Sequence, residues 1–166
     1  MPEVVVGVGS NIEPERNVVA AIDRLGAAFG SLRTSPVYRG PAIGMSGADF
    51  LNLVVSFHTT KTIDQVEAIL TEMESDSGRI RSSVVASRSL DLDLLLYGAR
   101  VDAARRVPRD DILLYPFVLL PLTDIAADGQ HPLTGERYSS AWQAMAEHGH
   151  GLQCVGKVSA LGSVTG

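Results

Sequence analysis

The sequence predicts an α+β protein of the ferredoxin-like βαββαβ class, in which an antiparallel sheet carries helices on one face and a helical extension follows at the C-terminal side. Segments with period-two or β-branched apolar patterns alternate with segments whose apolar residues recur at helical spacing. The 166 residues, 45% hydrophobic, suffice for one buried core. We expect a single domain over residues 1–150 and a weakly ordered tail over residues 151–166.

The first half of the pattern combines strands with one helix. The expected order is a strand, a helix, an edge strand, a loop and a strand, over residues 3–9, 12–30, 31–38, 39–49 and 50–58. Ser10 or Asn11 is the expected helix cap, and Gly30 ends that helix. Pro36 interrupts the second strand, which places it at an edge or a bulge.

The second half repeats the alternation. Thr62 and Gln65 have the spacing of a capping box, and the helical stripe that follows ends at Gly78. The stretch SRSLDLDLLLYG, residues 87–98, is a strand, and short helices are expected around residues 111–125 and 140–147.

Two carboxylates lie inside the leucine-rich strand. Because alternate strand residues share a face, Asp91 and Asp93 point to one side, with Cα atoms about 6.6 Å apart. Leucines 90, 92, 94 and 96 are expected on the opposite side, against the helices. The same periodicity places Phe50 and Asn52 on the open face, so an aromatic ring, an amide and two carboxylates should converge there.

An i, i+2 carboxylate pair has two interpretations. Carboxylates flanked by phosphate-binding side chains suit hydrated Mg²⁺ that is shared with substrate phosphates. Seven of the twelve arginines lie between Arg79 and Arg109, and arginine binds phosphate in bidentate fashion. Alternatively, both aspartates are solvated and paired with arginines, since D-x-D alone is a weak motif.

Composition narrows the class of partner. The net charge of −5 argues against nucleic acid as a main ligand, and the local arginines favour a small phosphorylated molecule. The longest apolar run, residues 112–122, has two prolines and is too short to cross a bilayer. The start of the chain lacks a secretory pattern, and the single Cys154 fits a reducing compartment. We expect a cytoplasmic protein, a monomer or weak dimer, without membrane or nucleic-acid partners.

Five segments, in order, resemble the 6-hydroxymethyl-7,8-dihydropterin pyrophosphokinase family of folate biosynthesis. They are VGVGSN, SPVYRGPAIG…DFLN, GRIR, SRSLDLDLLLYG and FVLLPLTDIAADGQHPLTG, within residues 6–135. The resemblance implies transfer of pyrophosphate from ATP to the hydroxymethyl group of a reduced pterin, with release of AMP. It also implies two Mg²⁺ ions, which would neutralise Asp91 and Asp93.

The resemblance assigns further roles residue by residue. The catalytic group it implies is Arg79, Arg88, Asp91 and Asp93, of which the two aspartates are also the metal ligands. The implied pterin-binding residues are Gly40, Pro41, Ile43, Phe50, Asn52 and Phe117. The implied ATP-binding residues are Glu74, Arg79, Arg88, Leu94 and Arg109.

The sequence departs from the family pattern on the nucleotide side. The stretch SSVVAS, residues 82–87, lacks the lysine and tryptophan usual in the family's mobile loop. Arg109 stands where the family has histidine, and Tyr115 stands where it has a second arginine. Three alternatives remain: the ordinary enzyme with a rewired loop, an enzyme for a related pterin or nucleotide, or a pterin-binding protein without kinase activity.

Overall fold

The computed structural model describes residues 1–42, 47–77 and 89–162. Its strands are β1 (Glu3–Ser10), β2 (Arg33–Thr34), β3 (Val37–Gly40), β4 (Phe50–His58), β5 (Asp91–Tyr97) and β6 (Gln153–Gly156). Its helices are α1 (Pro14–Phe29), α2 (Ile63–Asp76), the 3-10 turn η1 (Ala103–Arg105), α3 (Asp111–Leu114), α4 (Pro116–Ala126), α5 (Tyr138–Ala146) and α6 (Val158–Gly162). The sequence-based assignments from β1 to α5 are therefore confirmed within a few residues, except that the helix expected around residues 111–125 is divided into α3 and α4. The expected helix end at Gly78 and the expected strand start at residue 87 lie outside the described residues.

The described strands form one antiparallel, six-stranded sheet in the order β5-β1-β4-β3-β6, with β2 paired to β4 beside this path. β1 lies between β4 and β5, with Gly9 opposite Asn52 of β4 on one side and opposite Asp91 of β5 on the other. The pairing therefore brings the amide and the first carboxylate to the two flanks of one glycine.

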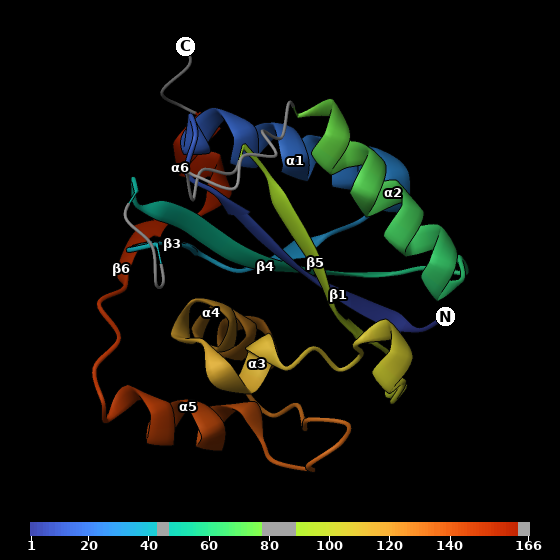
Figure 1. Cartoon of the computed structure of the whole chain (residues 1–166), viewed down its shortest axis with the longest axis vertical. Coiled ribbons are helices and arrows are strands. Elements are labelled where there is room, and N and C mark those ends of the chain that lie inside the picture. The colour runs from blue at the N-terminus through green and yellow to red at the C-terminus, as the bar shows by residue number, and fades with distance from the viewer. Residues whose placement is uncertain (43–46, 78–88, 163–166) are drawn as a thin grey trace.

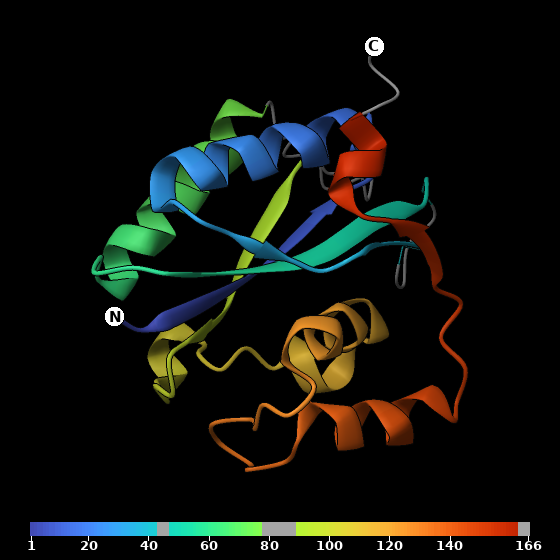
Figure 2. The ribbon, with the colours of Figure 1, turned by 180° about the vertical axis from the view of Figure 1, so that it is seen from behind.

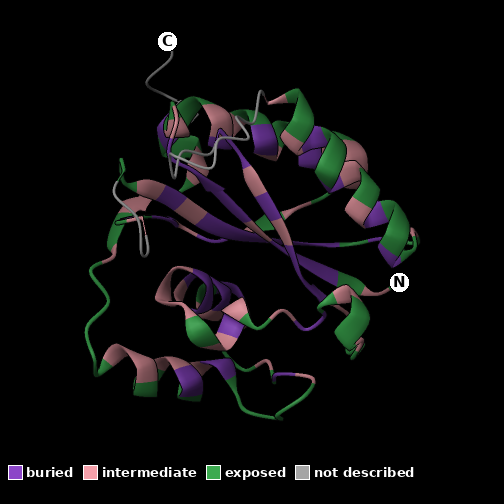
Figure 3. Cartoon of the chain, viewed as in Figure 1, coloured by how far each residue is buried: buried purple, intermediate pink, exposed green. Residues whose placement is uncertain are grey.

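Helices cover both faces of the sheet (Figures 1 and 2). α1 and α2 lie on one face, over a core that includes Val6, Leu53 and Leu92. α3 and α4 lie on the other face, over a second core that includes Val54 and Leu95. The buried residues follow the sheet between these layers (Figure 3). The second face, expected to be open, is thus partly covered by the C-terminal helical part.

Two local expectations were wrong. The cap of α1 is Glu13, in a left-handed conformation without a side-chain capping bond, while the Ser10 hydroxyl donates to the carbonyl of Ile12. The expected alternation in β5 fails after Leu94, because the β1–β5 register shifts there by one residue. That shift moves Leu96 into the second core, opposite to the face expected for it.

The tail also differs from expectation. Residues 153–156 form β6 along the free edge of β3, and α6 then places Leu161 in the first core. Backbone pairing and one apolar anchor therefore order residues that the sequence predicts to be weakly ordered; residues 163–166 lie outside the described part. The capping box of α2 is confirmed, with Thr62 and Gln65 bonded reciprocally.

Candidate functional site

One side of the site is formed by two glycines of β1. Gly7 and Gly9 point toward the second face and line a cavity of about 260 Å³ between the sheet and α4. At Gly9 an added Cβ would lie 2.6 Å from the Asn52 Oδ1, so only glycine lets this amide approach β1. The two glycines therefore form the floor of the cavity, and the neighbouring strands supply its functional groups.

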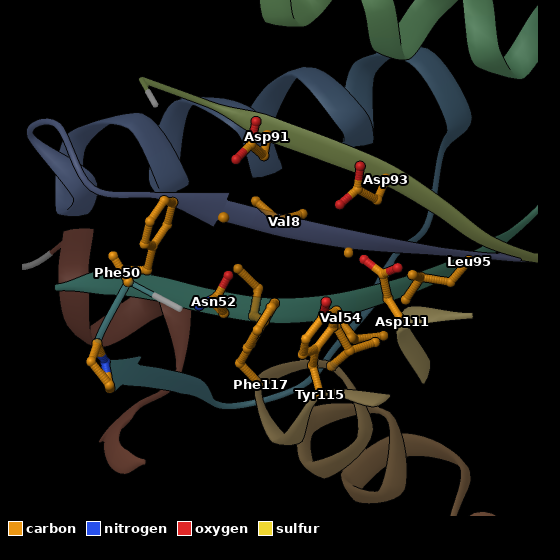
Figure 4. A pocket seen from close by; sticks show the side chains of 16 residues that line it. Val8, Phe50, Asn52, Val54, Asp91, Asp93, Leu95, Asp111, Tyr115 and Phe117 are labelled. Carbon is orange, nitrogen blue, oxygen red and sulfur yellow. The ribbon is translucent and has the colours of Figure 1, made fainter. Parts of the chain in front are cut away.

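The sequence-predicted residues converge on this cavity. Phe50 and Asn52 reach it from β4, Asp91 and Asp93 from β5, and Phe117 from α4 (Figure 4). The convergence predicted from the two strand periodicities is thus confirmed, although the roles of these residues are a separate question. Pro41 also lines the cavity, and Gly40 pairs with Phe50 at its edge.

Aromatic rings stand at two sides of the cavity. Figure 4 shows Phe50 at one end, Phe117 and Tyr115 at the other, and Asn52 between them. The rings of Tyr115 and Phe117 stack on each other with centroids 5.2 Å apart and an interplanar angle of 17°. A flat heterocycle would find apolar walls here, together with an amide that can bond to its polar edge.

Arg109 connects this cavity with a second one. Its guanidinium Nη2 lies 3.6 Å from the Asp93 Oδ1, and its Nε lies 3.2 Å from the Asp111 Oδ2. Asp93 lines both cavities, whereas Arg109 lines the second, which has a volume of about 280 Å³. The interpretation in which arginine pairs with an aspartate of the D-x-D motif is therefore realised at Asp93.

The second cavity is rich in arginine. Arg105 and Arg106 line it beside Arg109, with Leu94 in its wall. Arg105 is bonded to Asp64, and this bond lowers the pKa of the Asp64 carboxyl below its usual value. Glu67 and Asp93 line the same cavity, and its three arginines pair with carboxylates. Arginines that adjoin a carboxylate pair in this way are suited to a phosphorylated ligand with its metal ion.

Of the remaining predicted residues, the structure describes only Glu74, which lines neither cavity. Glu74 accepts a hydrogen bond from the backbone N–H of Leu92 at 3.0 Å, which links α2 to the start of β5. Its assignment to ATP stays a prediction. Ile43, Arg79 and Arg88 lie outside the described residues, so their predicted roles stay untested.

The donor set at the carboxylates fits Mg²⁺ that arrives with a nucleotide. Asp91 and Asp93 provide hard oxygen ligands on one face, and Asp93 keeps 41% of its side chain exposed. Within the described residues no group of three or more His, Cys, Asp or Glu side chains could hold a metal ion by itself. Mg²⁺ commonly keeps several waters and takes only one or two carboxylates plus phosphate oxygens, which matches this arrangement.

Sequence reasoning missed several lining residues. Gly7 and Gly9 carry a detectable signal, because glycines at i and i+2 in a strand remove side chains from one face. Tyr115 was mentioned only because the family pattern has an arginine at its position, and it was not expected to line the cavity. Asp111 lacks any such signal, since its place beside Arg109 depends on where α3 packs.

Comparisons with known proteins agree with this arrangement. The family model described as 7,8-dihydro-6-hydroxymethylpterin-pyrophosphokinase (HPPK) matches residues 5–127. A 2-amino-4-hydroxy-6-hydroxymethyldihydropteridine pyrophosphokinase of Synechocystis is 36% identical over 80% of this chain and 70% of its own. A protein of the same name from Pseudomonas aeruginosa is 35% identical over 78% of this chain and 83% of its own.

Solved structures agree on the fold. The crystal structure of Plasmodium falciparum HPPK-DHPS with pteroate matches with a TM-score of 0.71 at 9% identity, over 89% of this chain and 45% of that one. This chain thus spans less than half of that two-part protein. No described helix is long and apolar enough to cross a membrane. The family match and the curated relatives together show that the chain belongs to the 7,8-dihydro-6-hydroxymethylpterin-pyrophosphokinase family.

Proposed function

We propose that this protein transfers pyrophosphate from ATP to 6-hydroxymethyl-7,8-dihydropterin, yielding the pterin diphosphate and AMP in folate biosynthesis. The observation that supports the proposal best is the adjacency of the two cavities. One has aromatic walls and an amide, the other has three arginines beside Glu67, and Asp93 lines both. A pterin hydroxymethyl group and a nucleotide β-phosphate would meet at this junction.

The reaction needs positioning and charge stabilisation more than a protein nucleophile. The substrate hydroxyl oxygen forms the bond to the β-phosphorus, the bond from that phosphorus to the α–β bridging oxygen breaks, and AMP leaves. Phe50 and Phe117 stack with the pterin, and Asn52 bonds to its edge to fix its orientation. Arg109 holds a positive charge beside the transferring phosphates.

The proposed metal requirement is two Mg²⁺ ions, which bind with ATP. Asp91 and Asp93 hold them, and when bound they neutralise charge on the triphosphate. Arg109 partly balances the charge of Asp93 across 3.6 Å. Arrival of the nucleotide therefore exchanges this contact for phosphate contacts.

The proposed metal role is tested by substituting the two aspartates. Asp91→Asn and Asp93→Asn should each lower the rate of AMP formation by about two orders of magnitude or more, because each removes a charge at the reacting phosphates. Asp110→Asn is the matched control, since it removes the same charge from an exposed neighbouring residue. Unchanged rates in both site variants, with normal folding by circular dichroism, would reject the proposed metal role.

The proposed substrates and the single cysteine together favour a cytoplasmic location. ATP and a reduced pterin are cytoplasmic metabolites in this proposal, and the free, exposed Cys154 fits a reducing compartment. We expect a monomer or weak dimer without nucleic-acid partners. Light scattering coupled to gel filtration would measure the mass, and a stable higher oligomer would contradict this expectation.

A further inference from the structure

A leucine from the C-terminal segment occupies the space beside Gly40. A Cβ added at Gly40 would lie 2.6 Å from the Leu152 Cδ2. The Leu152 side chain would therefore have to shift to make room for a Cβ at position 40. Residue 152 is outside the span that the family model matches, residues 5–127.

Gly40 is the last residue of β3 and leads directly into the cavity wall. It pairs with Phe50 in the ladder, and cross-strand partners point to the same face of a sheet. Phe50, Pro41 and Ala42 all line the cavity. The Leu152 side chain at Gly40 therefore lies on the face that carries the proposed pterin site, next to the strand end from which Phe50 and the Pro41–Ala42 wall extend.

The Leu152 backbone is fixed at both ends of the adjoining element. β6 begins at the next residue, with Gln153 opposite Arg39 and Cys154 opposite Tyr38 of β3. β6 is followed by α6, in which Leu161 is buried in the first core. The leucine is therefore presented by an ordered edge strand rather than by a loose terminus.

We propose that Leu152 is a positioning residue for the pterin substrate, acting through Gly40 to hold Phe50 and the Pro41–Ala42 wall in place. This inference rests on the proposed function, because it takes the ligand of the first cavity to be a pterin. A misplacement of about 1 Å in a binding wall can cost up to about a hundredfold in turnover. A half-buried side chain at the edge of that wall should have a smaller effect.

The first test is steady-state kinetics of full-length Leu152→Ala. The KM for 6-hydroxymethyl-7,8-dihydropterin should rise about three- to tenfold while the KM for ATP stays unchanged. Leu152→Met should restore most of the lost affinity, because methionine fills the same volume. Val155→Ala is the matched control: it shortens a side chain of the same strand that packs against the first core. This control should lower the melting temperature without changing the pterin KM.

A double-mutant cycle makes the test specific for the contact. Gly40→Ala should raise the pterin KM with Leu152 present, and this penalty should shrink in the Gly40→Ala, Leu152→Ala double variant, where the 2.6 Å approach is gone. Equal penalties in both backgrounds, or an unchanged pterin KM in Leu152→Ala, would overturn the inference. A wild-type protein without pterin affinity would instead reject the proposed function.

Discussion

The guanidinium Nη2 of Arg109 lies 3.6 Å from the carboxylate Oδ1 of Asp93, across the boundary between the two cavities. The same side chain has its Nε 3.2 Å from Asp111, at an angle that leaves this buried Nε without a hydrogen bond among the described residues. The guanidinium of Arg109 is therefore held between two carboxylates by charge. The resemblance to the family leads us to expect histidine at position 109.

The first prediction concerns nucleotide affinity. Arg109→Gln should weaken binding of a non-hydrolysable Mg–ATP analogue about ten- to hundredfold, since a hydrogen bond to a charged group contributes about 1.5–3 kcal/mol. Isothermal titration calorimetry would measure this, with Arg100→Gln as an exposed control of equal charge change. Nucleotide affinity that is the same in both variants would show that Arg109 does not contact the phosphates.

The second prediction concerns the pterin edge. Asn52→Ala should weaken binding of the reduced pterin by about ten- to hundredfold, because polar groups of the ligand would then be buried without a partner at about 1–3 kcal/mol. His58→Ala, at the exposed end of the same strand, should bind normally. Fluorescence titration of the pterin distinguishes these outcomes, and an undiminished affinity for Asn52→Ala would remove the amide from the site.

The third prediction concerns the cavity floor. Gly9→Ala should lower pterin affinity, since its Cβ would lie 2.6 Å from the Asn52 Oδ1 and would push that amide away. Gly26→Ala is a useful contrast, because its nearest neighbour is 4.0 Å away and alanine favours a helix by about 1 kcal/mol. Pterin titrations should therefore show a lower affinity for Gly9→Ala. Thermal melts should show a higher stability for Gly26→Ala.

How far the site could be predicted depends on the kind of contact. Asp91, Asp93, Phe50 and Asn52 were predicted to converge because strand periodicity fixes the face on which each side chain stands. The same rule failed at Leu96, since a register shift is set by the pairing of two strands and not by either one. Asp111 was missed for a similar reason: its position depends on tertiary packing of a helix of four residues.

The tail shows a second limit. Residues 153–156 read as unstructured because four residues give too short a pattern, yet the unpaired edge of β3 provides backbone partners for them. The order of helices and strands along the chain likewise did not predict that α4 covers the second face of the sheet. Its residues Leu119 and Leu122 are fully buried, but a helical stripe alone does not specify which face of the sheet it meets.

The fourth prediction concerns acid stability. Burial lowers the pKa of His131, whose Nδ1 accepts hydrogen bonds from the backbone N–H groups of Leu133 and Thr134. The unfolded chain therefore takes up this proton first, at about pH 6.5, and the free energy of unfolding should decrease as the pH falls from there toward the folded pKa. Above about pH 6.5 this group adds no pH dependence.

Urea denaturation at pH 7.5 and pH 5.5 measures this effect. In His131→Asn, whose Oδ1 can still accept a backbone hydrogen bond, the loss of stability between these two pH values should be smaller than in the wild type. An equal loss in both proteins would assign the acid sensitivity to other groups.

The central claim is pyrophosphoryl transfer, and one assay tests it most directly. Purified protein, ATP, Mg²⁺ and 6-hydroxymethyl-7,8-dihydropterin are incubated together, and the nucleotide and pterin products are quantified by mass spectrometry. The altered nucleotide side should make turnover slower than that of an ordinary family member, by about two to three orders of magnitude for a loss of a few kcal/mol. The account predicts AMP and pterin diphosphate in equal amounts. Formation of ADP with a pterin monophosphate, or no AMP despite measurable pterin binding, would contradict it.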